Sequence, residues 1–147
     1  MRRVVVTGIG ALTPIGNNTD EFWNALTKGK SGGAPITRFD ASKFKTKFAC
    51  EVKGFNPLDF MEKSEIRRFD LYTQYALATV AEAINNGKID FDKMDRNRIG
   101  VIWGSGNGGI ETFQQQVTEY ALGDGTPRFN PFYSENDRGY CFRGNFY

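Results

Sequence analysis

The sequence predicts an α/β fold in which helices are layered on a mostly parallel sheet. Two apolar runs rich in β-branched residues, at residues 3–8 and 99–103, have the pattern of buried strands. A glycine-rich turn and then a helical pattern follow each run. Strands that alternate with helices in this way are typical of layered α/β domains.

Helical periodicity is seen first in the stretch "NNTDEFWNALTKGK". A helix is expected to begin after Asn18 or Thr19, because the side chain of either residue can cap it. Its apolar face would carry Phe22, Trp23 and Leu26. The glycines that follow are expected to end it.

Two further helices are expected, one from near residue 64 to residue 86 and one over residues 110–122. The longer one has apolar residues at three- and four-residue steps, alanines that permit close packing, and Gly87 as its C-terminal stop. Before it, "SKFKTKFACEVK" places Phe44 and Phe48 on one side and lysines on the other, which is the period of a half-buried strand or extended arm.

Composition limits the classes of function. The 147 residues fit one domain, and 19 lysines and arginines against 17 aspartates and glutamates leave a formal charge of +2, too little for a general nucleic-acid partner. No apolar run is long enough for a signal peptide or a membrane span, so we expect a cytoplasmic protein without a membrane partner.

Cys50 and Cys141 are expected to be free thiols without a metal, and histidine, the commonest general base, is absent.

The first glycine cluster, "TGIGALTPIG", lies where a dinucleotide-binding fingerprint would lie, after a strand and before a helix. Gly8 and Gly10 begin the fingerprint, but Thr13 occupies its third glycine position and Gly16 comes too late to replace it. No acidic residue ends a second strand about twenty residues later. A dinucleotide-binding oxidoreductase is therefore disfavoured, and no cofactor is expected.

The second glycine cluster matches G-x-G-x-x-G through Gly104, Gly106 and Gly109. A lone match is a weak signal, because glycines between a strand and a helix also serve a sharp turn or a close backbone approach. The start of the following helix could instead favour an anion. We favour the structural turn.

A basic cluster in "MEKSEIRRFD" places Lys63, Arg67 and Arg68 at i, i+4 and i+5, near one face of the predicted helix start. Taken alone, a solvated face interleaved with acidic residues explains this pattern. The alternative is a docking patch for an acidic partner, whose encounter would be fast and weakened by salt.

Six stretches occur in order along the chain: "RRVVVTGIGALTPIGN", "FWNALTKGKSG", "ITRFDASKFKTKFACEVKGF", "RRFDLYTQYALA", "RIGVIWGSGNGGI" and "PRFNPF". Together they closely resemble the opening of the bacterial β-ketoacyl-[acyl-carrier-protein] synthase II family. The resemblance is almost continuous from Arg2 to Phe132. It implies an incomplete N-terminal portion of a thiolase-like fold with αβαβα layers, a homodimer, and fatty-acid elongation by decarboxylative condensation of malonyl-carrier protein with an acyl-enzyme.

The resemblance also assigns roles to residues. Lys63, Arg67 and Arg68 match the family's basic helix that meets the acidic acyl carrier protein, which favours the docking alternative. Asn107 and Phe132 match positions near the acyl pocket, although some relatives have an apolar residue at the position of Asn107, and Cys50 is expected to be structural. The family's nucleophilic cysteine and its two histidines lie beyond the resembling region. Cys141 cannot replace that nucleophile, because no histidine is present to activate it.

The last fifteen residues depart from the family pattern. After "NPF" the family continues with Phe-Ile-Pro-Lys-Met-Ile-Ala-Asp-Ile-Ala, a small residue and Gly, whereas this chain has "YSENDRGYCFRGNFY". Synonymous codons for this stretch, read from the second base of the Tyr133 codon, permit the family run from Ile-Pro to Gly. We therefore expect residues 1–132 to be part of a synthase domain and residues 133–147 to be out-of-frame translation. The chain alone would be inactive; the alternative is a non-catalytic module that binds acyl carrier protein.

Overall fold

The computed structural model of the protein describes residues 3–126. The chain divides into two compact units. The first unit comprises Met1–Phe60 with Leu77–Ile89, and the second comprises Met61–Ala76 with Asp90–Tyr147. Helix α3 (Leu71–Asn86) therefore contributes its first residues to the second unit and the remainder to the first.

Helix α1 (Thr19–Thr27) confirms the first predicted helix. Its N-cap is Asn18, whose side-chain oxygen accepts a hydrogen bond of 2.8 Å from the backbone N–H three residues later. The predicted apolar face is wrong in part, because Trp23 and Leu26 are exposed and the buried residue is Ala25. An apolar stripe is buried only where another surface packs against it, and the periodicity of one helix does not specify that surface.

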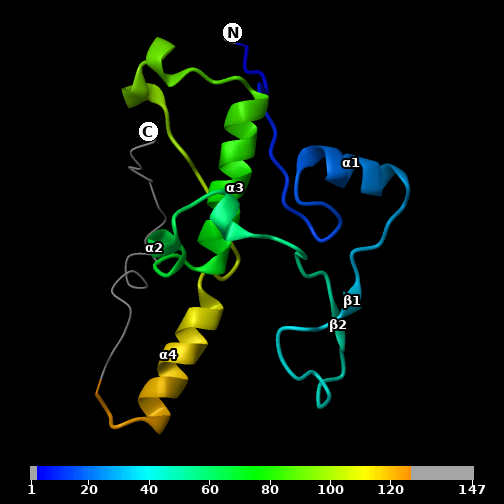
Figure 1. The fold of residues 1–147 in the computed structure, drawn as a ribbon, viewed down its shortest axis with the longest axis vertical. Helices are drawn as coiled ribbons and strands as arrows, with labels where there is room; N and C mark the ends of the chain where they lie inside the picture. The colour runs from blue at the N-terminus through cyan, green and yellow to red at the C-terminus, as the bar shows by residue number, and fades with distance from the viewer. Residues whose placement is uncertain (1–2, 127–147) are drawn as a thin grey trace. The chain divides into compact units, whose positions relative to one another are not determined.

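In the first unit, the N-terminal segment runs beside the later turns of α3 (Figure 1). A Cβ atom on Gly8 would lie 2.2 Å from the carbonyl oxygen of Ala83, and one on Gly10 would lie 2.1 Å from that of Thr79. Real Cβ atoms do not approach backbone oxygens so closely. The first glycine cluster therefore has a structural role, which is to let two backbones lie against each other.

The buried strands predicted at residues 3–8 and 99–103 are wrong: neither segment forms a strand. Both segments expose apolar side chains, and the exposed fractions of Val4 and Ile102 are 95% and 98%. A strand exists only when a neighbouring strand satisfies its backbone N–H and C=O groups. Neither segment has such a neighbour within residues 3–126.

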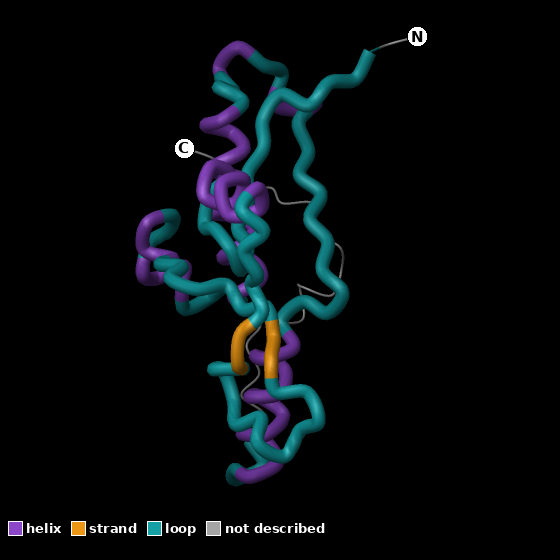
Figure 2. The backbone as a smooth tube through the Cα atoms, turned by 90° about the vertical axis from the view of Figure 1, so that its right-hand side faces the viewer, coloured by secondary structure: helices purple, strands orange, loops and turns teal. Residues whose placement is uncertain are grey.

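The sheet within residues 3–126 is antiparallel rather than parallel. It pairs β1 (Ala34–Pro35) with β2 (Phe48–Ala49), and Figure 2 shows the two short strands in orange. The expected alternating strand is thus reduced to two residues, and Phe44 and Phe48 are both exposed. Pro35 has no N–H to donate, which limits the ladder.

The single long helix predicted from residue 64 is divided into α2 (Lys63–Ile66) and α3. The buried side chain of Gln74 explains how the break is stabilised. Its Nε2 donates hydrogen bonds to the carbonyl oxygens of Ile66 at 3.2 Å and Phe69 at 2.8 Å. One side chain thus satisfies two carbonyl groups that a continuous helix would have bonded internally.

The predicted end of the long helix is confirmed, since α3 stops at Asn86. The left-handed residue that follows is Lys88, with φ of 50°, rather than Gly87. Gly87 instead allows a close approach, because a Cβ there would lie 3.1 Å from the carbonyl oxygen of Thr7. A small residue is therefore required at position 87 because of close packing, and not because of the backbone dihedral angle φ.

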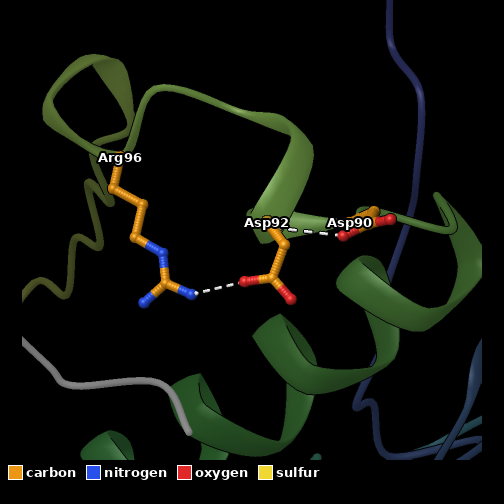
Figure 3. Close-up of polar contacts among 3 residues, drawn as sticks. All are labelled: Asp90, Asp92 and Arg96. Atoms are coloured by element: carbon orange, nitrogen blue, oxygen red, sulfur yellow. Dashed lines mark hydrogen bonds and ion pairs between the residues drawn. The ribbon is translucent and has the colours of Figure 1, made fainter.

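Two single turns of 3₁₀ helix, η2 (Phe91–Lys93) and η3 (Arg96–Arg98), follow α3 in the second unit. Figure 3 shows two of their polar contacts: Arg96 donates to Asp92 at 3.1 Å, and the Asp92 N–H donates to the Asp90 carboxylate at 3.1 Å. Hydrogen bonds from the Lys93 ammonium, 2.7 Å away, and from the Asp92 N–H hold the pKa of Asp90 below its ordinary value.

Helix α4 (Ile110–Leu122) confirms the last predicted helix. Gly109 precedes it with φ of 63°, a left-handed conformation that favours glycine, so the structural interpretation of that position is confirmed. No helix in residues 3–126 combines the length and the apolar character that crossing a membrane requires.

Candidate functional site

The basic cluster lies at and just after α2 in the second unit. Lys63 begins the helix, Arg67 is its C-cap, and Arg68 belongs to the turn that follows. The expectation that all three share one helix face is wrong, because α2 ends at Ile66 and both arginines follow it. All three side chains are exposed, and no ion pair within residues 3–126 involves Lys63 or Arg67.

The acidic residues beside this cluster are engaged in holding helices. A carboxylate oxygen of Glu65 accepts a hydrogen bond of 3.0 Å from the backbone N–H of Glu62, at the start of α2. The Asp70 carboxylate accepts a hydrogen bond from the hydroxyl of Thr112 on α4. The solvated-face alternative placed these acids among the basic residues, and the contacts of Glu65 and Asp70 give them structural roles as well.

A polar groove of about 290 Å³ lies between the turn after α2 and helix α4. We call it the arginine groove. Its first wall is formed by Arg67, Arg68, Phe69 and Asp70, and its second by Thr112, Gln115, Gln116 and Glu119. On the second wall, the Gln115 amide donates a hydrogen bond of 2.8 Å to the Glu119 carboxylate.

Two of the three predicted docking residues, Arg67 and Arg68, line this groove, and Lys63 does not. The sequence did not predict that α4 forms the second wall of the groove. Its residues stand at i, i+3, i+4 and i+7 of a predicted helix, which marks one polar face, but periodicity alone does not indicate what that face opposes.

The remaining candidates are not brought to the groove. Asn107 is exposed in the turn before α4 and does not line the groove. Phe132, proposed for the acyl pocket, and Cys141 lie outside the described residues. Cys50 is a free thiol, as expected, and it is exposed.

Residues 1–138 match the family model for the beta-ketoacyl synthase, N-terminal domain. The chain belongs to the beta-ketoacyl synthase family. It is 40% identical over 131 residues to a 3-oxoacyl-[acyl-carrier-protein] synthase 2 from Synechocystis, a match that covers 89% of this chain and 31% of the relative. This synthase chain therefore spans about a third of the length of the curated relative.

Solved ketosynthases have the same fold. The chain matches the ishigamide ketosynthase/chain length factor with a TM-score of 0.74 and 28% identity, over 90% of this chain and 33% of that one. A structure of a type II PKS acyl-carrier protein in complex with its ketosynthase matches with a TM-score of 0.71 and 23% identity, over 91% and 34% of the two chains. The predicted class, an incomplete N-terminal portion of a thiolase-like layered fold, is confirmed, as is the resemblance to synthase II.

Proposed function

We propose that this chain supplies the acyl-carrier-protein docking surface of a 3-oxoacyl-[acyl-carrier-protein] synthase. The whole enzyme would condense malonyl-carrier protein with an acyl-enzyme by decarboxylation, acting as a homodimer in the cytoplasm. The arginine groove carries the proposal, because two exposed arginines line it together with polar residues of α4. The name of the Synechocystis relative and the complex of a ketosynthase with its acyl-carrier protein support it.

The chemistry of the groove suits an acidic protein partner. A guanidinium group presents several N–H donors in a fixed plane, a geometry that matches a carboxylate better than an ammonium does. Exposed positive charge also raises the rate at which an acidic partner is encountered, and salt screens that attraction over roughly 10 Å at 0.1 M ionic strength. Lys63, four residues before Arg67 at the start of α2, adds a third positive charge without lining the groove.

Reversing both charges, in the double variant Arg67→Glu and Arg68→Glu, is expected to weaken binding of holo-acyl carrier protein about tenfold or more at low salt. The matched control is Lys43→Glu with Lys45→Glu, which changes the net charge equally at two exposed positions outside the groove. Fluorescence anisotropy of labelled carrier protein measures both affinities. Equal weakening by the two double variants would contradict a specific docking surface.

We further propose that residues 133–147 are out-of-frame translation and that these 147 residues alone do not catalyse condensation. The sequence contains no histidine, and the match to the Synechocystis relative extends over 131 residues. The family model extends to residue 138, six positions past Phe132. Sequencing the gene from the Pro127 codon onward tests the proposal. We expect the reading frame that starts at the second base of the Tyr133 codon to continue into a cysteine- and histidine-containing synthase. If the family sequence does not continue in that frame, the proposal is overturned.

A further inference from the structure

We infer that the arginine groove receives one carboxylate side chain of the carrier protein, and that Glu119 on α4 opposes that carboxylate and so limits which acidic partners bind. This inference rests on the proposed docking function and assigns a role to the second wall. The family resemblance assigns docking roles to Lys63, Arg67 and Arg68 and to no residue of α4. Helix α4 nevertheless belongs to the same site, because four of its side chains line the groove.

The size of the groove indicates a side chain rather than a small-molecule substrate. Its volume of about 290 Å³ is at the lower limit of ligand pockets, which are typically about 300 to 1,000 Å³ and mostly apolar. Seven of its eight lining residues are polar or charged, and the exception is Phe69. A groove of this kind suits a hydrated carboxylate at the tip of a partner's side chain.

The second wall carries a negative charge, the exposed carboxylate of Glu119. Glu119 is one helical turn beyond Gln115, and the hydrogen bond of 2.8 Å from the Gln115 amide holds its carboxylate. The hydroxyl of Thr112 is also committed, because it donates to Asp70. An incoming carboxylate therefore meets two arginines on one wall, where the Asp70 carboxylate already accepts the Thr112 hydrogen bond, and the charge of Glu119 on the other.

This arrangement gives selectivity through repulsion as well as attraction. A partner with a single well-placed carboxylate can contact the arginines and avoid Glu119. A partner with a denser acidic surface would bring a second carboxylate against α4, where the like charge opposes it. The groove would thus prefer a particular acidic pattern over general negative charge.

Glu119→Gln tests the inference, because glutamine keeps the oxygen that accepts the Gln115 hydrogen bond and removes only the charge. We expect binding of holo-acyl carrier protein to tighten about two- to fivefold at low salt, the range measured for exposed charge pairs. The matched control is Glu111→Gln, which removes the same charge from the same helix outside the groove and should change affinity by less than about 1.5-fold. The difference between the two variants should shrink as salt is raised.

The outcomes separate the inference from the proposed function. If the double arginine reversal weakens binding but Glu119→Gln and Glu111→Gln behave alike, docking stands and the role of Glu119 is overturned. Weaker binding by Glu119→Gln would also overturn it, since Glu119 would then be an attractive contact. If the arginine reversal has no specific effect, the docking function itself fails. Circular dichroism of each variant is the folding control, and we expect the helix content to be unchanged by either glutamine.

Discussion

Replacing Gly10 with alanine is expected to lower the free energy of unfolding of the first unit by about 3 kcal/mol, the upper end of the usual cost of overpacking. The added Cβ would lie 2.1 Å from the carbonyl oxygen of Thr79 and 3.0 Å from the backbone nitrogen of Ala83. Both atoms belong to the α3 backbone, which cannot rotate away as a flexible side chain could. The N-terminal segment would have to separate from the helix, with a loss comparable to a large share of the usual ~5 to 15 kcal/mol of a domain.

Hydrogen exchange of the α3 backbone amides measures this loss, because it reports the local free energy of opening. Gly33→Ala is the matched control in the same unit. The nearest atom to a Cβ at Gly33 is the Ser31 hydroxyl oxygen at 3.5 Å, an ordinary contact, so its effect should stay within about 0.5 kcal/mol. If both alanine variants left α3 protection unchanged, the close packing of the N-terminal segment on α3 would be wrong.

Local signals in the sequence predicted the start of α1, the end of α3 and the start of α4, but not the division between α2 and α3. Asn18 and the polar first turn predicted the start of α1, and glycines marked the boundaries of α3 and α4. The break before α3 was not predicted, because the segment keeps a helical apolar spacing. It depends on Gln74, whose buried amide bonds carbonyl groups five and eight residues earlier.

Strands and the second wall of the site required information that local pattern does not contain. Residues 3–8 and 99–103 have strand-like composition, yet a strand also needs a partner, and none pairs with them in the part of the chain described. The arginine groove presents the same difficulty. The charges of Arg67 and Arg68 are evident from the sequence. The contact between Asp70 and Thr112 is not, because it joins residues that are 42 positions apart.

The second large effect is expected at Glu82, a half-buried residue of α3 in the first unit. One of its carboxylate oxygens accepts a hydrogen bond of 2.7 Å from the backbone N–H of Ala11, and the other accepts one of 2.6 Å from that of Thr19. Thr19 is the first residue of α1, so this carboxylate also lies at the positive end of that helix. A single side chain therefore ties the glycine-rich segment and α1 to α3.

Glu82→Ala is expected to cost about 3 kcal/mol, because each lost hydrogen bond to a charged group costs ~1.5 to 3 kcal/mol and water can recover part of that loss. The adjoining cavity of about 80 Å³, lined by Glu82 and Ala11 among others, is large enough to admit water. Glu82→Gln should cost less, roughly 1.5 kcal/mol, since it keeps one acceptor oxygen but turns an NH₂ group toward the other N–H donor.

The order of these two variants distinguishes hydrogen bonding from simple loss of side-chain volume. If charge and the number of acceptors stabilise the unit, hydrogen exchange should show α3 protection in Glu82→Gln that lies between that of Glu82→Ala and that of the unsubstituted chain. If only side-chain volume matters, the α3 protection in Glu82→Gln should equal that of the unsubstituted chain. Glu51→Gln is the control, because Glu51 is half-buried like Glu82 and its carboxylate also accepts hydrogen bonds from Thr37, at 2.6 Å for the hydroxyl, but these bonds are exposed whereas those of Glu82 are partly buried. Water replaces such bonds readily, so a loss at Glu51 as large as that at Glu82 would exclude burial as the reason for the effect.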